Sequence, residues 1–321
     1  MRILFITSNR LGDAILSTGL LAGIVERDPL AKITVACGPA AAGLFQTSAM
    51  PNLERLIVVE KKPWARHWWE LWKQVATTRW SMVVDLRGSG LSQFLMAYRR
   101  RVFHGSGSSV HRVIVLSQLL RLPPTAPRIW IGEANEKRAR RLWDGKQPVL
   151  AIGPTANWGG KIWPADRFAE LAQRLTAPDG ILPGARIAVF GGPGEEALAQ
   201  PVLDLLPPDR AMNFVGKLDL LDLGAALQRC ALYIGNDSGL MHLAAAVGTP
   251  TVGLFGPSKE SVYGPWGQKT AAVRTDLSYD EIVTSPGYDY RKQDSHMLTL
   301  SVDKAQRAAE TLWRYCQDDD D

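Results

Sequence analysis

Residues 235–258 read GNDSGLMHLAAAVGTPTVGLFGPS, and their pattern is the strongest indication of the fold. The apolar residues that precede Asn236 predict the end of a β-strand, and the small residues from Gly239 onward predict a closely packed helix. A second strand is expected at 251–255, followed by a loop at 256–258. A strand, loop and helix that lead into another strand are typical of the βα units of a parallel sheet.

The same alternation extends in both directions along the 321-residue chain. Apolar strands are expected in the first half at 2–7, 33–37, 56–60, 82–86 and 102–104, and in the second half at 149–155, 186–190, 232–234, 251–255 and 271–274. Helical spacing of apolar residues predicts a helix at 13–27. We therefore predict an α/β protein made of two Rossmann-like, doubly wound domains that face each other across a cleft.

Prolines and charge mark the boundary between the two domains. Pro123, Pro124 and Pro127 interrupt regular structure, and a charged helix, EANEKRARRLW, follows at 133–143. We place the first domain at 1–145 and the second at 146–321. The last helix, predicted at 302–316, is expected to pack back on the first domain.

Composition indicates a globular protein of a reducing compartment. Hydrophobic residues make up 46% of the chain and charged residues 21%. Cys37, Cys230 and Cys316 have the spacing of neither a disulfide framework nor a metal site. Arg10 and Asp13 interrupt any signal-peptide apolar region, and we find no apolar stretch long enough to span a bilayer. We expect a soluble, cytoplasmic protein that can still contact a membrane.

Charge is distributed unevenly between the halves. Residues 1–145 hold 21 lysines and arginines against 10 acids, whereas residues 146–321 hold 16 against 22. The basic half predicts an anionic partner, although a solvated basic surface without a partner gives the same signal.

Three further motifs follow predicted strands, where α/β proteins bind ligands. In SNRLGDAILSTGLL (8–21), Gly12 permits close approach of a ligand to the backbone. Asp13 is either a helix N-cap or a general base that acts on an acceptor hydroxyl. In GPTANWGGKIWPADRFAEL (153–171), Lys161 stands beside a glycine-rich loop that suits a diphosphate, unless this is an ordinary loop with a solvated lysine. In FGGPGEEALA (190–199), Glu195 or Glu196 could bind a ribose diol. Alternatively, these acids are present simply because the helix dipole favours negative charge at a helix N-terminus.

The stretch at 235–258 itself provides an anion site in this scheme. A loop opens into a helix N-terminus, whose N–H groups and dipole suit a phosphate. Ser238 offers a hydroxyl, Asp237 can accept from sugar or ribose hydroxyls, and His242 lies one turn into the helix. A histidine in such a place is otherwise more often a core or capping residue.

Taken in order, these motifs resemble glycosyltransferase family 9, the heptosyltransferases of lipopolysaccharide core assembly. The matching pieces are RLGDAILSTGLL, VVDLRGSG, GGKIWPADRFAEL, GGPGEEALA, GNDSGLMHLAAAVGTPTVGLFGPS and MLTLSVDKAQ. The resemblance implies a GT-B fold, with the acceptor on the N-terminal domain and the nucleotide-sugar on the C-terminal domain. It also implies inverting transfer from ADP-heptose without a metal or other cofactor. The implied partners are an anionic lipopolysaccharide inner-core acceptor and the inner membrane surface, with no nucleic acid.

The resemblance also assigns roles to individual residues. Asp13 matches the catalytic base, and Gly12 lies beside it. Lys161 matches the lysine that holds the donor diphosphate, and Thr155 lies where a hydroxyl residue often meets phosphate. The donor loop corresponds to Asp237, Ser238, Gly239 and His242, and Glu196, in preference to Glu195, matches the acid that contacts ribose.

One region departs from this pattern. Residues 277–295 match no motif, and His296 stands where the family often has a cysteine. PWARHWWELWKQ (63–74) predicts a tryptophan-rich helix that either docks at a membrane interface or packs into the core. A GT-B transferase with another nucleotide-sugar, or a non-catalytic nucleotide-sugar-binding protein, remains the alternative function.

Overall fold

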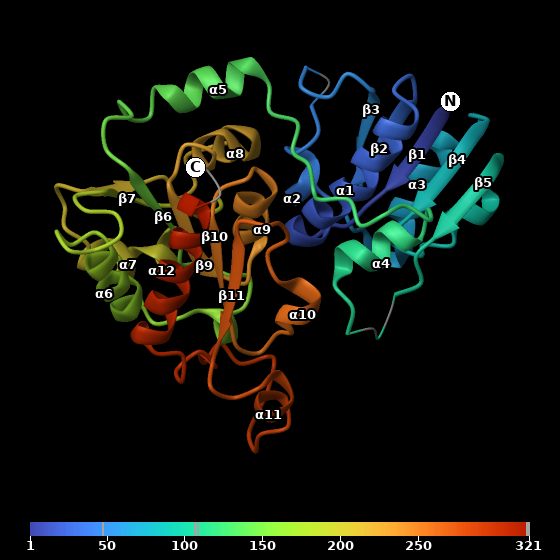
Figure 1. Ribbon diagram of the computed structural model, residues 1–321. Coiled ribbons are helices and arrows are strands. Elements are labelled where there is room, and N and C mark those ends of the chain that lie inside the picture. The colour runs from blue at the N-terminus through green and yellow to red at the C-terminus, as the bar shows by residue number, and fades with distance from the viewer. Residues whose placement is uncertain (47, 106, 108, 319–321) are drawn as a thin grey trace. The chain divides into compact units, whose positions relative to one another are not determined.

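The computed structural model describes residues 1–46, 48–105, 107 and 109–318. The chain divides into two compact units, Met1–Gly132 and Glu133–Asp321, which we call the first and second units. Each is an α/β unit built on a parallel sheet (Figure 1). None of the helices in the described ranges has the length and apolar character needed to cross a bilayer.

The sheet of the first unit has the order β3-β2-β1-β4-β5 among the described residues. Its strands are β1 (Arg2–Ile6), β2 (Lys32–Cys37), β3 (Leu53–Val58), β4 (Trp80–Asp85) and β5 (Ala97–Val102). The chain winds outward in opposite directions from β1, so the sheet is doubly wound, as predicted. The predicted strand at 102–104 is wrong in position, because β5 is an edge strand rich in arginine and shows little apolar pattern.

The helices of the first unit cover both faces of this sheet. They are α1 (Leu11–Arg27), α2 (Pro39–Ala42), α3 (Arg66–Val75) and α4 (Arg112–Gln118), with 3₁₀ turns η1 (Pro63–Ala65) and η2 (Leu91–Phe94). α1 is buried from Ala14 to Ile24. A Cβ on Gly19 would collide with the Thr125 carbonyl oxygen, so this glycine lets the chain cross closely over α1.

The sheet of the second unit has the order β11-β10-β9-β6-β7-β8 among the described residues. Its strands are β6 (Val149–Gly153), β7 (Arg186–Val189), β8 (Ala211–Asn213), β9 (Leu232–Asn236), β10 (Thr251–Phe255) and β11 (Thr270–Arg274). Apart from β8, each was predicted from its apolar residues. β8 is a three-residue edge strand with one buried side chain, too short for a periodic signal.

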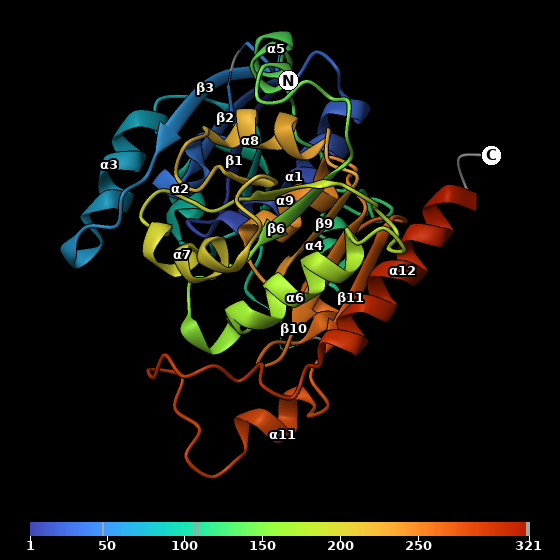
Figure 2. The ribbon, with the colours of Figure 1, turned by 90° about the vertical axis from the view of Figure 1, so that its left-hand side faces the viewer.

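The helices of the second unit pack around this sheet (Figure 2). They are α5 (Glu133–Arg140), α6 (Ala165–Leu175), α7 (Glu196–Leu205), α8 (Leu220–Leu227), α9 (Gly239–Ala246), α10 (Glu260–Tyr263), α11 (Tyr279–Val283) and α12 (Val302–Asp318), with a 3₁₀ turn, η3 (Gly159–Lys161). α12 packs against α6, β10 and β11. This last helix lies within the second unit, where its buried face completes the core, and its expected packing on the first domain stays a prediction.

Helix α5 moves the division between the units to residue 132, upstream of the predicted boundary at 145. Asp222 of α8 accepts hydrogen bonds from the Asn135 amide at 2.7 Å and from two guanidinium nitrogens of Arg138, each at 2.7 Å. Arg229 lies over the Trp143 ring at 4.5 Å. These contacts explain why the charged stretch after the prolines belongs with the second unit.

Candidate functional site

The candidate site of the second unit lies at the carboxyl ends of β6 and β9. These neighbouring strands form the point from which the chain winds in opposite directions, which is where open α/β sheets bind ligands. The loop after β6 carries Thr155 and leads to Lys161, and the loop after β9 carries Asp237 and Ser238. The structure thus brings two separately predicted motifs to one sheet edge.

Lys161 and Asp237 form an ion pair at the centre of this edge. The Lys161 ammonium donates to Asp237 Oδ2 at 2.5 Å, and the two side chains are 23% and 7% exposed. Lys161 is therefore a partly enclosed cation held in place by a buried carboxylate. Such a cation can neutralise phosphate oxygens that approach the loop.

Asn236 joins the two loops, a role that sequence reasoning missed. Its side chain is fully buried, accepts from the Trp163 N–H at 3.1 Å and donates to the Pro154 carbonyl at 2.8 Å. The loop that carries Lys161 is thus held to the end of β9 on both sides, at Pro154 and at Trp163. A polar residue at the end of an otherwise apolar strand was the available signal.

The helix after β9 presents its N-terminus at the same edge. Ser238 is the N-cap residue of α9, and Gly239 is its first residue. His242 lies one turn later, and its side chain is buried. Main-chain N–H groups at the start of a helix, together with the positive end of its dipole, form an anion site.

Thr155 contacts the glycine-rich loop after β7 through Glu195. The Thr155 hydroxyl donates to Glu195 Oε2 at 2.6 Å, and the Gly192 N–H donates to the same oxygen at 2.7 Å. Glu195 is half-buried, whereas Glu196, the first residue of α7, is exposed. The structure joins Thr155 to Glu195, and the ribose contact of Glu196 stays a prediction.

A buried tyrosine explains two glycines beneath the site. Gly153 and Gly235 lie opposite each other on β6 and β9, and a Cβ on either would collide with the Tyr233 hydroxyl. Burial raises the pKa of this phenol above its ordinary value. The glycines therefore make room for an aromatic side chain that lies under the ligand-side loops.

The segment that matched no motif is attached to the loop that carries Lys161. The Trp158 indole donates to the Lys292 carbonyl at 2.6 Å, the Gly159 N–H donates to Gln293 Oε1 at 2.7 Å, and the His296 N–H donates to the Gly160 carbonyl at 3.0 Å. The ring centroids of Trp158 and His296 are 5.7 Å apart. This segment therefore supports the Lys161 loop from outside.

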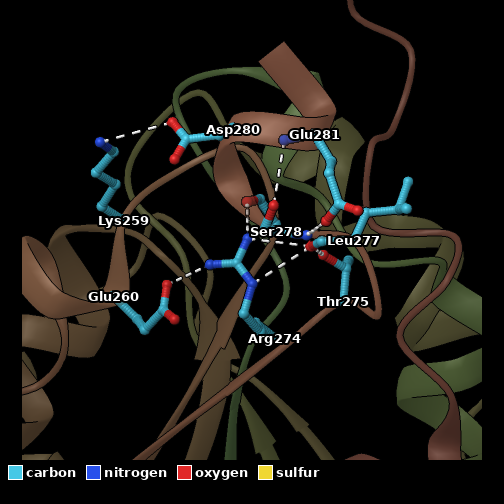
Figure 3. A network of polar contacts seen from close by, with 9 residues as sticks. Lys259, Glu260, Arg274, Thr275, Leu277, Ser278, Asp280 and Glu281 are labelled. Atoms are coloured by element: carbon cyan, nitrogen blue, oxygen red, sulfur yellow. Dashed lines mark hydrogen bonds and ion pairs between the residues drawn. The ribbon is translucent and has the colours of Figure 1, made fainter. Parts of the chain in front are cut away.

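Arg274 anchors the loop after β10, as Figure 3 shows. Its guanidinium donates to the Gly256 carbonyl at 2.8 Å and to the Leu277 carbonyl, and it is paired with Glu260. Ser278 and Glu281 cap α11 reciprocally beside it. The hydroxyl of Ser258 in the anchored loop is buried and has no hydrogen-bond partner among the described residues.

The predicted catalytic residue belongs to the first unit. α1 begins at Leu11, so Gly12 and the half-buried Asp13 lie in its first turn. Asp13 is therefore not the N-cap; that position belongs to Arg10. The carboxylate is near the carboxyl end of β1, at the strand from which this sheet winds in both directions.

Asp85 organises the neighbouring loop and was missed as an individual residue. It is fully buried at the end of β4 and accepts from the Arg87 N–H at 2.9 Å and the Ser89 hydroxyl at 2.8 Å. Arg87 donates to Asn9 Oδ1 at 2.6 Å, which connects the loops after β1 and β4. Burial lowers the pKa of the Arg87 guanidinium, with Asp85 opposing the shift.

The described part of the chain contains no cluster of side chains that could form a metal site. No group of three or more histidine, cysteine, aspartate or glutamate side chains there is arranged to hold an ion. Cys37, Cys230 and Cys316 are free and buried.

The model of glycosyltransferase family 9 (heptosyltransferase) matches residues 94–285, which is more than half of the chain. The chain belongs to glycosyltransferase family 9. The resemblance inferred from the motifs is therefore confirmed.

Individual relatives agree with this assignment. Lipooligosaccharide heptosyltransferase 2 of Haemophilus influenzae is 32% identical over 163 residues, which cover 48% of this chain and 46% of that protein. The chain thus spans about half the length of the curated relatives it matches. A family 9 glycosyl transferase of Veillonella parvula is 26% identical, with a TM-score of 0.81 over 98% of this chain and 97% of that one.

A second solved structure bears on the fold. The structure of E. coli ADP-heptose lps heptosyltransferase II is 21% identical, with a TM-score of 0.75 over 99% of this chain and all of that one. The predicted α/β class, a GT-B fold of two Rossmann-like domains, is confirmed. The expected cleft between the domains stays a prediction.

Proposed function

We propose that this protein is an inverting glycosyltransferase that moves heptose from ADP-heptose to a lipopolysaccharide inner-core acceptor. The observation that carries the proposal is the Lys161–Asp237 pair beside the N-terminus of α9. Its relatives in Haemophilus influenzae and Salmonella typhimurium are named heptosyltransferases, and the E. coli structure is described as acting with ADP-heptose. These names support a heptose donor and a glycolipid acceptor.

The donor side of the mechanism concerns the departing diphosphate. Breaking the bond between the anomeric carbon and the phosphate oxygen leaves negative charge on that oxygen. Lys161, His242 and the first N–H groups of α9 would stabilise this charge more strongly in the transition state than in the ground state. We assign Asp237, Ser238 and Gly239 to the same donor loop.

Further donor contacts belong to the other loops of this edge. Thr155 would meet a phosphate, since its buried hydroxyl follows β6 directly. Glu196 would contact the ribose, and Glu195 would hold Thr155 in position.

The acceptor side of the mechanism concerns Asp13. As the acceptor oxygen bonds to the anomeric carbon, its proton passes to the Asp13 carboxylate and ADP leaves from the opposite face. One displacement of this kind inverts the anomeric centre. Gly12 would keep the backbone beside the reacting hydroxyl uncrowded.

We also propose that transfer needs no metal, because Lys161 and the helix N-terminus would supply the positive charge that a metal ion could otherwise provide at the diphosphate. The enzyme would act in the cytoplasm, at the inner face of the membrane that holds its glycolipid acceptor. Nucleic acid is not a proposed partner. Chelation by EDTA should leave the rate unchanged, and a loss that is restored by one divalent cation would contradict metal independence.

The decisive experiment is transfer from ADP-heptose to defined truncated cores, followed by product mass. The wild-type protein should add one heptose, and D13N should lose at least about 100-fold in kcat because general base catalysis contributes about that much. ADP should raise the melting temperature of both proteins equally, since the base does not hold the donor.

Three outcomes would contradict the proposal. Stabilisation by UDP or GDP but not by ADP would indicate another nucleotide-sugar. Binding of ADP-heptose without transfer to any core would indicate a binding protein. Full activity of D13N would remove Asp13 from the mechanism.

A further inference from the structure

We propose that the first unit carries a docking surface for the anionic face of a lipid bilayer, formed by α3, the turn before it, and the segment from η2 into β5. We call it the aromatic–basic surface. It rests on the proposed location of the enzyme at a membrane, but not on the identity of donor or acceptor. The tryptophan-rich stretch at 63–74 is its main element.

Large apolar side chains are exposed along this surface. The exposed fractions are 95% for Trp64, 56% for Trp69, 76% for Phe94, 50% for Met96 and 83% for Tyr98. Single exposed apolar residues are ordinary, but a group of five that includes four aromatic rings marks an interaction site.

Direct contacts join α3 to η2. Trp69 stacks on Trp72 with ring centroids 4.8 Å apart, and the Trp72 indole donates to the Phe94 carbonyl at 3.1 Å. The opposite face of α3 packs into the core of the first unit through Leu71 and Val75. One face of the helix therefore packs into the core, and the other is the face that we assign to the membrane.

The turn before α3 holds Trp64 outward in an uncommon conformation. Trp64 and Ala65 have φ angles of 55° and 56°, the left-handed region that bulky side chains rarely adopt. Such strain is usually kept where it serves a function. Here it leaves an indole almost fully exposed at the end of the helix.

Basic residues surround the exposed rings. Lys73 lies 5.4 Å from the Trp69 centroid and Arg99 lies 5.6 Å from the Tyr98 centroid. Lys61 and Arg66 are exposed beside Trp64. Aromatic rings flanked by lysine and arginine fit the boundary between anionic headgroups and acyl chains.

Acidic side chains do little to offset this charge. Glu70 accepts from the Lys62 ammonium at 2.7 and 2.9 Å, and this hydrogen bond lowers the pKa of Glu70. Glu60 is the other acid in the stretch from 60 to 79, which has five lysines and arginines. Charge complementarity therefore favours an anionic bilayer as the occupant.

Cosedimentation with vesicles tests the surface without donor or acceptor. The full-length protein should bind vesicles that contain phosphatidylglycerol, bind phosphatidylcholine vesicles much more weakly, and dissociate as salt rises. W64A/W69A should lower the partition coefficient at least about tenfold through lost apolar burial. R66A/K73A should lower it about fivefold per residue.

A matched control is available on the second unit, where Tyr290 and Tyr315 are also exposed. Y290A/Y315A should bind vesicles as the wild type does, and all variants should retain the melting-temperature shift with ADP. Undiminished vesicle binding by W64A/W69A, or equal binding to neutral vesicles, would overturn the proposal. A dimer of the wild type that W64A/W69A abolishes would instead assign the surface to a second copy.

Transfer to a water-soluble, delipidated core, measured without vesicles, separates this proposal from the proposed function. W64A/W69A should keep wild-type activity on that acceptor. If vesicle binding fails while this transfer succeeds, the docking surface is wrong and the enzymatic function stands.

Discussion

The Lys161–Asp237 pair has a structural role and a proposed catalytic role, which a double substitution can separate. K161M leaves the Asp237 carboxylate, 7% exposed, without its counter-charge, so we expect about 3 kcal/mol of lost stability. K161M/D237N should recover most of that loss, because no charge is then buried alone. Both variants should lose at least about 100-fold in kcat, since neither can hold the diphosphate.

Urea unfolding and ADP release measure the two effects independently. K304M is the control, because Lys304 pairs with the exposed Asp276 at 3.0 Å and such pairs contribute about 1 kcal/mol or less. If K161M kept full stability, the ion pair would not be the buried contact described above. If it kept full activity, Lys161 would have no role at the diphosphate.

Among the structural elements, the segment 277–295 should act through the loop that it supports. Q293A removes the oxygen that accepts the Gly159 N–H at 2.7 Å. A hydrogen bond of this kind contributes about 1 kcal/mol, so the Kd for ADP should rise about fivefold. Calorimetric titration with ADP measures this change.

The neighbouring residue provides a control that differs in one respect. Lys292 contacts the loop through its main-chain carbonyl, which accepts from the Trp158 indole, while its side chain is exposed. K292A should therefore bind ADP as the wild type does. Equal affinities for Q293A and K292A would show that the segment does not position the loop.

The contact between α5 and α8 should contribute much of the free energy that holds α5 against the rest of the second unit. D222A removes the acceptor for Asn135 and Arg138 and leaves the buried Asn135 amide without that partner. We expect a loss of about 2 kcal/mol in unfolding free energy, measured by urea denaturation. E136A, which removes only an exposed pair with Arg140, should change it by less than about 0.5 kcal/mol. Comparable losses in the two variants would contradict this contact's importance.

Across both sheets the buried central strands were predictable, whereas one edge strand of each sheet, β5 or β8, was not. Continuous runs such as ILFI in β1 and TVGLF in β10 are buried on both faces and stand out by composition alone. β5 contains three consecutive arginines, and β8 has three residues. Their pairing depends on the neighbouring strand, which no local pattern reveals.

The candidate site shows the same limit. Lys161 and Asp237 were predicted because each follows a strand and carries a charge in a ligand-side loop. Their direct contact across 76 positions, the bridge through Asn236 and the anchor at Arg274 are tertiary facts. Sequence reasoning therefore predicted charged groups in the ligand-side loops and missed the residues that hold those loops in place.

Buried thiol and phenol groups in the two units should make the unfolding free energy fall at alkaline pH. Burial raises the pKa of the Cys37 thiol in β2 to about 12, and it also raises the pKa values of Cys230 and Tyr233 in the second unit. An unfolded cysteine has a pKa of about 8.5. Above that pH the unfolded chain releases protons that the native protein retains, so alkali favours unfolding. This stability is fully present below about pH 8.5 and is lost as pH rises toward the native pKa values.

Each thiol should steepen the fall in unfolding free energy by about 1.4 kcal/mol per pH unit above pH 8.5. Urea unfolding between about pH 7 and pH 10 measures this slope. C37A and C230A should each lower it by about 1.4 kcal/mol per pH unit, which is the contribution of one proton. V35A, a buried truncation on the same strand as Cys37, should lower stability at every pH without changing the slope. Because Cys37 and Cys230 lie in different units, C37A should flatten only the first unit's transition if the units unfold separately. A slope that neither cysteine variant changes would mean that the thiols titrate alike in the folded and unfolded chains, and it would contradict the raised pKa values.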